Sequence, residues 1–167
     1  MSEILHDGFR VTGIRLENGS SVMADVVVAN ADASQVYSSF SHMRPVEMPA
    51  IYLCSTTGHG WDWNDREYSR SYAEKIIDQI ESRGIEIRSR LELLKIRTPA
   101  DLERETFAPG GSIYGTSSNG ARAAFLRAKN RSPLRGLFCV GGSAHPGGGL
   151  PLVGISSEIV ANAIGRA

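Results

Sequence analysis

The sequence predicts an α/β fold, on the strength of three features. Two short segments of alternating polarity flank Asn18 and Gly19, which indicates a β-hairpin. Residues 25–30 form an apolar, β-branched run, as in an interior strand of a sheet that is covered on both faces. In the last third, a short apolar strand at 137–140 leads into a glycine-rich loop and then a helix. We therefore expect strands and helices to share one sizeable core.

The hairpin is predicted over residues 8–24. Its apolar alternation changes phase at Gly13, where a strand can carry a bulge. Asn18 and Gly19 favour a tight turn, because both residues accept positive φ. Residues 31–49 predict a short helix that runs into a linker, and residues 51–55 are a further strand candidate.

Two helices are predicted in the middle of the chain. Apolar residues recur at helical spacing between Tyr68 and Ile80, and Gly84 is placed to end that helix. Residues 85–96 fit either a strand or a helix. Thr98 as N-cap and Pro99 at the first helical position predict a second helix, which the glycines at 110 and 111 would break.

The amino-acid composition limits the kinds of binding partner and cellular setting that we expect. The 18 basic and 18 acidic side chains balance, and no basic stripe offers the field that nucleic-acid binding requires, so nucleic acid is not an expected partner. Cys54 and Cys139 lie in apolar runs, which favours buried thiols and a cytoplasmic setting. No apolar run is long enough to span a membrane, although peripheral membrane contact of a parent protein stays open. The scattered histidines predict no metal site.

The glycine-rich loop at 141–149 is the main candidate site. A strand, a loop of small residues and a helix start together present free backbone N–H groups and the positive end of the helix dipole. A phosphate or an electron-rich cofactor edge suits such a place, since glycines let it approach the main chain closely. The alternative is a flexible loop that merely closes onto a helix. The Gly-x-Gly-x-x-Gly fingerprint is absent.

Five segments stand out by their order and spacing: VMADVVVANAD at 22–32, TPADLE at 98–103, GGSIYG at 110–115, NRS at 130–132 and GLFCVGGSAHPGGGLP at 136–151. Together they resemble the phytoene-desaturase-like family of FAD-dependent carotenoid and retinoid oxidoreductases. The likeness covers residues 8–40 and 61–167, and the last segment is the most specific.

The resemblance implies a partial FAD-binding domain, Rossmann-like and of the glutathione-reductase type, with remnants of a substrate lobe. Residues 1–40 would be the hairpin and returning strand of the FAD-binding domain, and residues 41–60 a linker and strand. Residues 61–96 would be a helix-containing remnant of the substrate lobe. Residues 97–167 would form the C-terminal segment of the FAD site.

The resemblance also implies eight cofactor-binding residues in three groups. They are Val28, Ala29 and Asn30; Gly141, Gly142 and Ser143; and Leu152 and Val153. The strand group would lie beside the ADP half of FAD, with an ordinary buried strand end as the alternative. The loop group would face the ribityl phosphate, and the helix group would offer backbone N–H groups to the flavin.

The activity implied is hydride transfer between an apolar isoprenoid substrate and flavin. Fixed N–H donors would stabilise the negative charge of the reduced ring. We assign no catalytic residue: His145 suits an acid or base but equally a loop residue bonded to backbone. Trp61 and Trp63 suit a polyene channel but more often anchor a core.

Two departures from the family pattern point to an incomplete enzyme. The family's N-terminal dinucleotide-binding glycine motif has no counterpart here. A long substrate-binding insertion is also missing between residues 37–40 and 49–52. The alternative is therefore a truncated, non-catalytic α/β module that binds no flavin alone. An apolar face left uncovered by missing lobes would favour a homo-oligomer.

Overall fold

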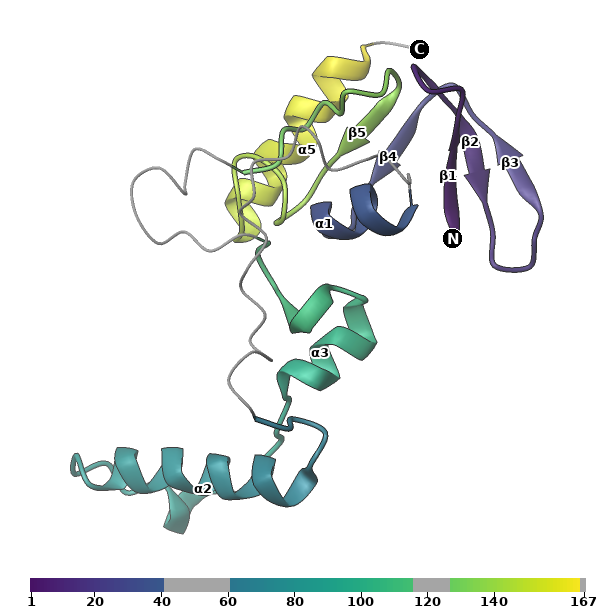
Figure 1. The fold of residues 1–167 in the computed structure, drawn as a ribbon. Helices are drawn as coiled ribbons and strands as arrows, with labels where there is room; N and C mark the ends of the chain where they lie inside the picture. Colours follow the sequence, from purple (N-terminus) through teal and green to yellow (C-terminus); the bar gives the residue numbers. More distant parts are fainter. Residues whose placement is uncertain (41–60, 116–126, 166–167) are drawn as a thin grey trace. The chain divides into compact units, whose positions relative to one another are not determined.

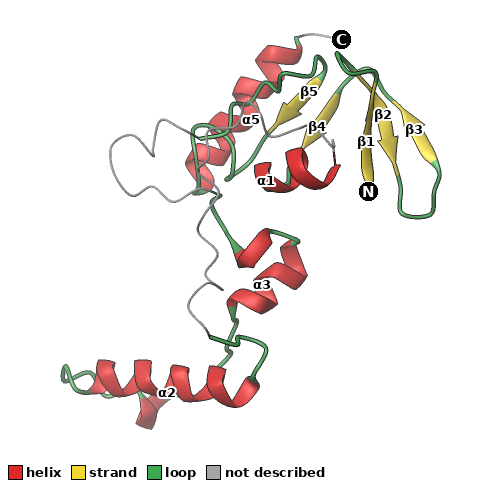
Figure 2. Cartoon of the chain, viewed as in Figure 1, coloured by secondary structure: helices red, strands yellow, loops and turns green. Residues whose placement is uncertain are grey.

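The computed structural model describes residues 1–40, 61–115 and 127–165 (Figure 1). The chain divides into two compact units, of which the first comprises Met1–Cys54 and Ile113–Ala167 and the second Ser55–Ser112. The second unit is thus inserted into the sequence of the first, and it holds residues 61–96 together with the start of the 97–167 segment. The described chain is mixed α/β with small sheets, as the sequence predicts (Figure 2).

A three-stranded antiparallel sheet opens the first unit. It contains β1 (Glu3–His6), β2 (Val11–Arg15) and β3 (Ser21–Met23), in that order. The predicted hairpin is confirmed as β2 and β3, where Gly13 pairs with Met23. Strand β1 was not predicted, since its partner is chosen by tertiary pairing rather than by a local pattern.

The bulge expected near Gly13 is present in β2. Opposite the step from Leu5 to His6, β2 supplies one extra residue, Thr12, next to Gly13. Gly13 also approaches β3 closely, because a Cβ there would lie 2.2 Å from the carbonyl oxygen of Val22. No side chain fits at that position without moving the backbone.

The hairpin turn differs from the prediction in one respect. The N–H of Leu16 donates to the carbonyl of Ser20 at 2.8 Å, which closes a three-residue loop. Gly19 has φ of 84°, but Asn18 does not have positive φ. A three-residue loop needs one left-handed residue at its end, whereas the two-residue turn that the Asn-Gly pair suggested needs two.

A parallel pair of strands, β4 (Val27–Ala29) and β5 (Leu137–Cys139), forms the second sheet. Val28 is 47% exposed, so the expectation that both faces of this strand are covered is wrong for the described chain. A continuous apolar run indicates that a strand forms, but it does not show whether other elements pack on both of its faces.

The core of the first unit lies between the two sheets and the helical turn that follows β4. Short α1 (Ala33–Gln35) continues into a π-helical turn, Val36–Phe40, whose Val36 is fully buried. This agrees with the short helix predicted after residue 31. The buried cluster is Ile4, Val11, Val27, Ala29, Val36, Leu134, Leu137, Cys139 and Ala144.

The helix predicted after the glycine-rich loop is confirmed as α5 (Leu150–Ile164). Ser156 and Val160 are its buried residues, one turn apart. Cys139 is 1% exposed and free, which confirms a buried thiol, whereas Cys54 lies outside the described residues. Burial raises the pKa of the Cys139 thiol, and a hydrogen bond with Tyr37 only partly offsets this.

Both helices predicted in the second unit are confirmed. Helix α2 (Arg66–Glu81) starts at an Asp65 N-cap and ends before Gly84, whose φ is 85°. Helix α3 (Pro99–Thr106) starts with a Thr98 capping box. It ends earlier than the glycines at 110 and 111, and a 3₁₀ turn, Pro109–Gly111, follows. The earlier end has a physical cause, because a residue before proline avoids helical geometry.

Residues 85–96 form neither the strand nor the helix considered for them, apart from the 3₁₀ turn Arg88–Arg90. The Arg88 guanidinium instead contacts three carboxylates of α2, those of Glu74, Asp78 and Glu81, at 2.6–2.8 Å. The Glu81 carboxylate also accepts the Arg88 backbone N–H at 2.9 Å. These bonds fold the chain back onto α2. No helix among the described residues is long and apolar enough to cross a membrane.

Candidate cofactor site

The carboxyl ends of β4 and β5 bring two of the three predicted groups together. Because the strands are parallel, both chains leave the sheet at the same edge. The N–H of Val140 donates to the carbonyl of Ala29 at 3.0 Å. A Cβ on Gly141, whose φ is 103°, would lie 2.3 Å from Oδ1 of Asn30. The strand group and the loop group are therefore neighbours, although more than a hundred residues separate them in sequence.

A buried polar cluster fixes the start of the glycine-rich loop. Asn130 is 6% exposed, and its Nδ2 donates to the carbonyls of Cys139 (3.1 Å) and His145 (2.9 Å) and to Oγ of Ser156 (3.0 Å). Ser156 is fully buried in α5, and its Oγ also accepts the Gly141 N–H at 3.3 Å. The loop is thus attached to both its preceding strand and its following helix.

Among the five predicted residues of the loop and helix, three have backbone N–H groups without an acceptor in the described chain, namely Gly142, Ser143 and Leu152. The N–H groups of residues 147–150, which lie between them, are likewise unengaged. Two other predicted residues have engaged N–H groups. Gly141 donates to Ser156, as above, and Val153 donates to the carbonyl of Gly149 at 3.0 Å. The unengaged donors are in the loop and the first helical turn, where an anion or an acceptor-rich group is favoured.

The loop leaves room for close approach at Gly142. A Cβ there would make only ordinary contacts, 3.6 Å from Gly148 Cα and from Cδ1 of Tyr114. At Gly148, by contrast, a Cβ would lie 2.0 Å from Cδ1 of Tyr114. Packing within the chain therefore demands glycine at Gly148 but not at Gly142, where a missing side chain leaves the main chain accessible.

Two charged residues at the loop were missed by sequence reasoning. The Asp32 carboxylate accepts from the N–H of Ser34 and from Oγ of Ser143, both at 3.0 Å. Arg127 Nη1 donates to the carbonyls of Tyr114 (2.7 Å) and Gly142 (3.2 Å). Arg127 belongs to a stretch with no sequence pattern, so only the tertiary fold reveals that a cation lies against the loop.

The remaining candidates lie as follows. His145 has an exposed side chain, while its N–H donates to the carbonyl of Ala128 at 2.9 Å. Trp63 packs in an aromatic cluster, with ring centroids 5.3 Å from Tyr72, whereas Trp61 is 46% exposed. Within the described ranges, no three His, Cys, Asp or Glu side chains are grouped so as to hold a metal ion.

Comparison with known proteins finds relatives that are named as desaturases, dehydrogenases and oxygenases. No protein-family model matches the chain. A 1-hydroxycarotenoid 3,4-desaturase of a Flavobacterium species is 41% identical over 82 residues, which is 48% of this chain and 17% of the relative. A 4,4'-diapolycopen-4-al dehydrogenase of Metabacillus indicus is 34% identical over 110 residues, 65% of this chain and 22% of the relative.

A longer alignment is found with a 4,4'-diaponeurosporene oxygenase of Staphylococcus aureus. It is 33% identical over 233 residues, and it covers 93% of this chain and 47% of the relative. Since this chain has 167 residues, the relative carries residues within the aligned span that have no counterpart here. The chain spans less than half of the length of each of these relatives. Over the part of their length that it covers, the chain belongs with the phytoene-desaturase-like carotenoid desaturases and oxygenases.

Proposed function

We propose that this chain supplies the C-terminal part of the flavin site of a phytoene-dehydrogenase-like, FAD-dependent oxidoreductase. The whole enzyme would transfer hydride between an apolar isoprenoid substrate and flavin. The relatives support this, since their names are those of enzymes that desaturate or oxidise carotenoids. The observation that carries it is the unengaged N–H groups of Gly142, Ser143 and Leu152, in the loop and the helix start that follow β5.

The donor set fits the groups that FAD presents. Flavin oxygens and nitrogens and the phosphate oxygens are acceptors, and the free N–H groups are donors in a fixed framework. Arg127 adds a positive charge against the loop. Asp32 is a carboxylate in the same neighbourhood, and its two oxygens accept hydrogen bonds from Ser34 and from Ser143. The Ser143 hydroxyl is thereby oriented toward Asp32, which leaves the Ser143 backbone N–H for a ligand.

Each part of the chain has a role in this proposal. Bound FAD would supply the hydride chemistry, and the protein would bind, orient and exclude water. Gly142 and Ser143 would hold the ribityl phosphate, and Leu152 would donate to the ring. Val28, Ala29 and Asn30 would lie beside the ADP half, in a Rossmann-like sheet of the glutathione-reductase type. The second unit would include the remnant of a substrate lobe, in a cytoplasmic enzyme with peripheral membrane contact.

The test is FAD binding by the purified chain and by Gly142→Val. Wild type should take up FAD, seen as visible flavin absorbance that stays with the protein after gel filtration. Gly142→Val should lose it, because a branched side chain blocks approach to the N–H groups while the first Cβ fits the fold. Gln79→Val, at an exposed position of α2 in the second unit, is the control, because it introduces the same side chain outside the loop.

The competing proposal is a non-catalytic α/β module that binds no flavin alone. It is favoured by the residues that the Staphylococcus aureus relative carries within the aligned span and that have no counterpart in this chain. A colourless preparation that ignores added FAD would support it. FAD affinity that is equal in wild type and Gly142→Val would remove the loop from the site.

A further inference from the structure

The aromatic ring of Tyr114 lies directly against the glycine-rich loop. A Cβ on Gly148 would lie 2.0, 2.4 and 2.7 Å from Cδ1, Cγ and Cε1 of this ring, and a Cβ on Gly142 would lie 3.6 Å from Cδ1. The next residue is also close to the loop, since a Cβ on Gly115 would lie 3.0 Å from Cα of Ser143. The ring therefore contacts the loop at a place where the chain has room only for glycine.

Arg127 fixes the backbone that carries this ring. Its Nη1 donates to the carbonyl of Tyr114 at 2.7 Å and to the carbonyl of Gly142 at 3.2 Å. A Cβ on Gly147 would lie 3.0 Å from Nε of Arg127, so the same side chain also lies against the second half of the loop. One cation thus joins the Tyr114 backbone to both halves of the loop. The ring is held in position before any ligand binds, which reduces the entropy cost of using it in binding.

The Tyr114 ring is exposed next to backbone donors that have no acceptor. Tyr114 is 50% exposed, so part of its surface is open to a ligand. The N–H groups of Gly142 and of residues 147–150 are unengaged in the part of the chain that the structure describes. A ligand that accepts from these N–H groups comes within reach of the ring. Contact between aromatic rings is favourable beyond the area that it buries, so this place favours a ligand with acceptor atoms and a flat ring in one molecule.

We propose that Tyr114 is the residue that contacts the isoalloxazine ring of a flavin held by the glycine-rich loop. This inference rests on the proposed function, and it adds an aromatic contact to the backbone donors described there. The N–H groups bind acceptor atoms of the flavin, Tyr114 packs against its ring, and Arg127 positions Tyr114.

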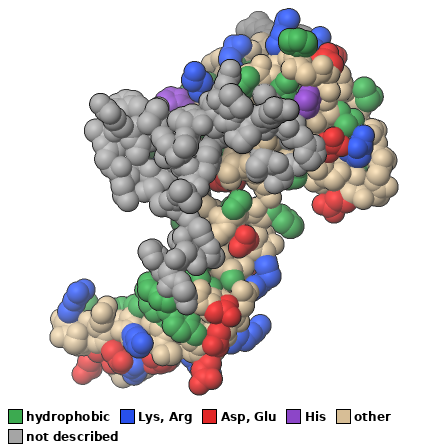
Figure 3. Space-filling view, viewed as in Figure 1, with side chains coloured by type: hydrophobic (Ala, Val, Ile, Leu, Met, Phe, Trp, Pro, Cys, Tyr) green, Lys and Arg blue, Asp and Glu red, His purple; other side chains and the backbone are tan. Residues whose placement is uncertain are grey.

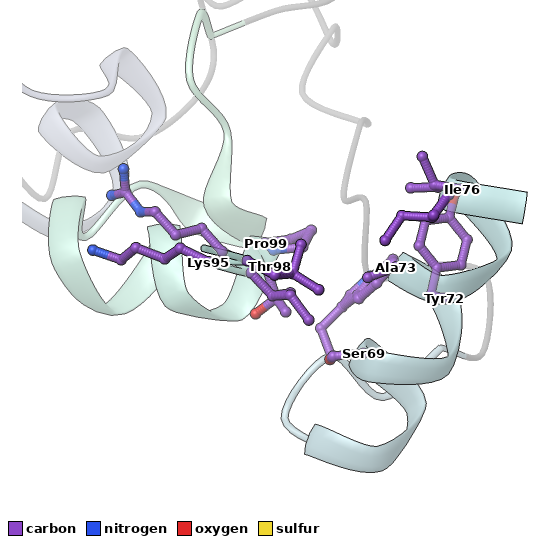
Figure 4. Close-up of a pocket in the computed structure, with 12 residues that line it drawn as sticks. Ser69, Tyr72, Ala73, Ile76, Lys95, Thr98 and Pro99 are labelled. Carbon is purple, nitrogen blue, oxygen red and sulfur yellow. The ribbon is translucent and has the colours of Figure 1, made fainter. Parts of the chain in front are cut away.

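The second unit offers a competing place for a flavin ring, and it supplies the matched control. Figure 3 shows hydrophobic side chains gathered on this unit. A pocket of 390 Å³ there is lined by Tyr72, Ile76 and Leu94 among others (Figure 4). Tyr72 is 39% exposed, so its ring is open to a ligand as that of Tyr114 is. A flavin bound in this pocket would contact Tyr72 instead of Tyr114.

The test is the fluorescence of FMN bound to the purified chain. FMN has the isoalloxazine ring and the ribityl phosphate but lacks the ADP half of FAD, and fluorescence lifetimes separate bound from free FMN. A tyrosine in contact with an excited flavin quenches its emission, because an electron passes from the phenol ring to the flavin and then returns. Phenylalanine packs similarly but does not give up an electron in this way. Emission of bound FMN should be strongly quenched in wild type and should rise several-fold in Tyr114→Phe, with little change in affinity.

Two further variants complete the test. Tyr114→Leu should bind FMN roughly two- to tenfold more weakly, because the contact between the rings is lost. Tyr72→Phe should keep both the affinity and the quenched emission of wild type. Tyr114→Phe keeps the test decisive if leucine disturbs the loop, since the atoms that a Cβ on Gly148 would meet are ring carbons that phenylalanine retains.

Three results would overturn the inference: unchanged emission in Tyr114→Phe, a rise in emission in Tyr72→Phe, or binding by Tyr114→Leu that is as tight as that of wild type or tighter. Tighter binding would mean that the ring blocks the loop. In each of these cases wild type still binds flavin, so flavin binding by the chain stands without Tyr114. If wild type binds neither FMN nor FAD, the proposed function and this inference both fail.

Discussion

Asn130→Ala tests whether the buried polar cluster fixes the glycine-rich loop. The wild-type side chain donates from Nδ2 to the carbonyls of Cys139 and His145 and to Oγ of Ser156, at 2.9–3.1 Å. Alanine removes all of these bonds at once. Because Cys139 is 1% exposed and Ser156 fully buried, these acceptors lie away from bulk water.

The expected loss of stability follows from those contacts. An amide group has two N–H protons, so at most two strong bonds are lost, each with a net value of about 1 kcal/mol. The buried acceptors left unsatisfied add to this, although carbonyls tolerate it better than N–H groups do. We expect the free energy of unfolding of the first unit to fall by about 2–3 kcal/mol.

The assay is urea unfolding followed by two signals. Both tryptophans, Trp61 and Trp63, belong to the second unit, so tryptophan fluorescence reports that unit, while circular dichroism reports both. The Asn130→Ala change should appear in circular dichroism but leave the fluorescence midpoint in place. Asn162→Ala, at an exposed position of α5, is the control and should change stability by less than about 0.5 kcal/mol.

The reasoning is refuted if Asn130→Ala unfolds like the control. The reasoning is also refuted if the fluorescence midpoint falls as much as the circular dichroism midpoint, since Asn130 would then stabilise the second unit as much as the first.

Three further predictions concern other parts of the chain. Gly111→Ala should destabilise the second unit by about 1–3 kcal/mol in fluorescence-detected unfolding, because its Cβ would lie 2.1 Å from the Pro99 carbonyl oxygen at φ of 68°. A hydrogen bond from the backbone N–H of Thr98 holds the pKa of the Asp101 carboxyl below its ordinary value of 3.8. The ionised carboxylate therefore stabilises α3 at pH values above 3.8, and this stabilisation is lost as the pH falls through the lower pKa of the folded state. Asp101→Asn should flatten this acid limb in thermal melts, and an unchanged limb would contradict it. Leu150 is 89% exposed, so we expect self-association that Leu150→Asp reduces in light scattering; a wild-type monomer would refute this.

Local signals allowed the helices to be predicted. The start of α3 follows from Thr98 and Pro99, whose capping and fixed φ act within one turn. The spacing of apolar residues located α2 and α5, because a helix repeats its pattern over many residues. The predicted end of α3 is too late in the sequence, because Pro109 already disfavours helical geometry at the residue before it, ahead of the glycines at 110 and 111.

Pairing across the chain could not be predicted. Four residues from Glu3 to His6 carry no period, so β1 is defined only by its partner. Val28 was predicted to be interior because its neighbours in sequence are apolar. Its side chain is exposed, because burial of that face of the strand requires another element to pack on it, and the local sequence does not show whether one does. At the candidate site, the glycines were visible as a motif. Arg127 lies outside the five segments, and the contact of Asp32 with Ser143 joins two segments that only the tertiary fold brings together, so neither residue could be assigned to the loop from the sequence.

The insertion of the second unit between β4 and β5 sets the order in which the chain can fold. The partners Val27 and Leu137 are about 110 residues apart, so bringing them together closes a long loop and is entropically slow. The hairpin and α2 involve near neighbours and can form first. During synthesis, β4 emerges from the ribosome long before β5, and its hydrogen-bonding edge stays unpaired until β5 is made. We expect the nascent chain to be most prone to aggregation in this interval, because an unpaired strand edge can pair with another chain.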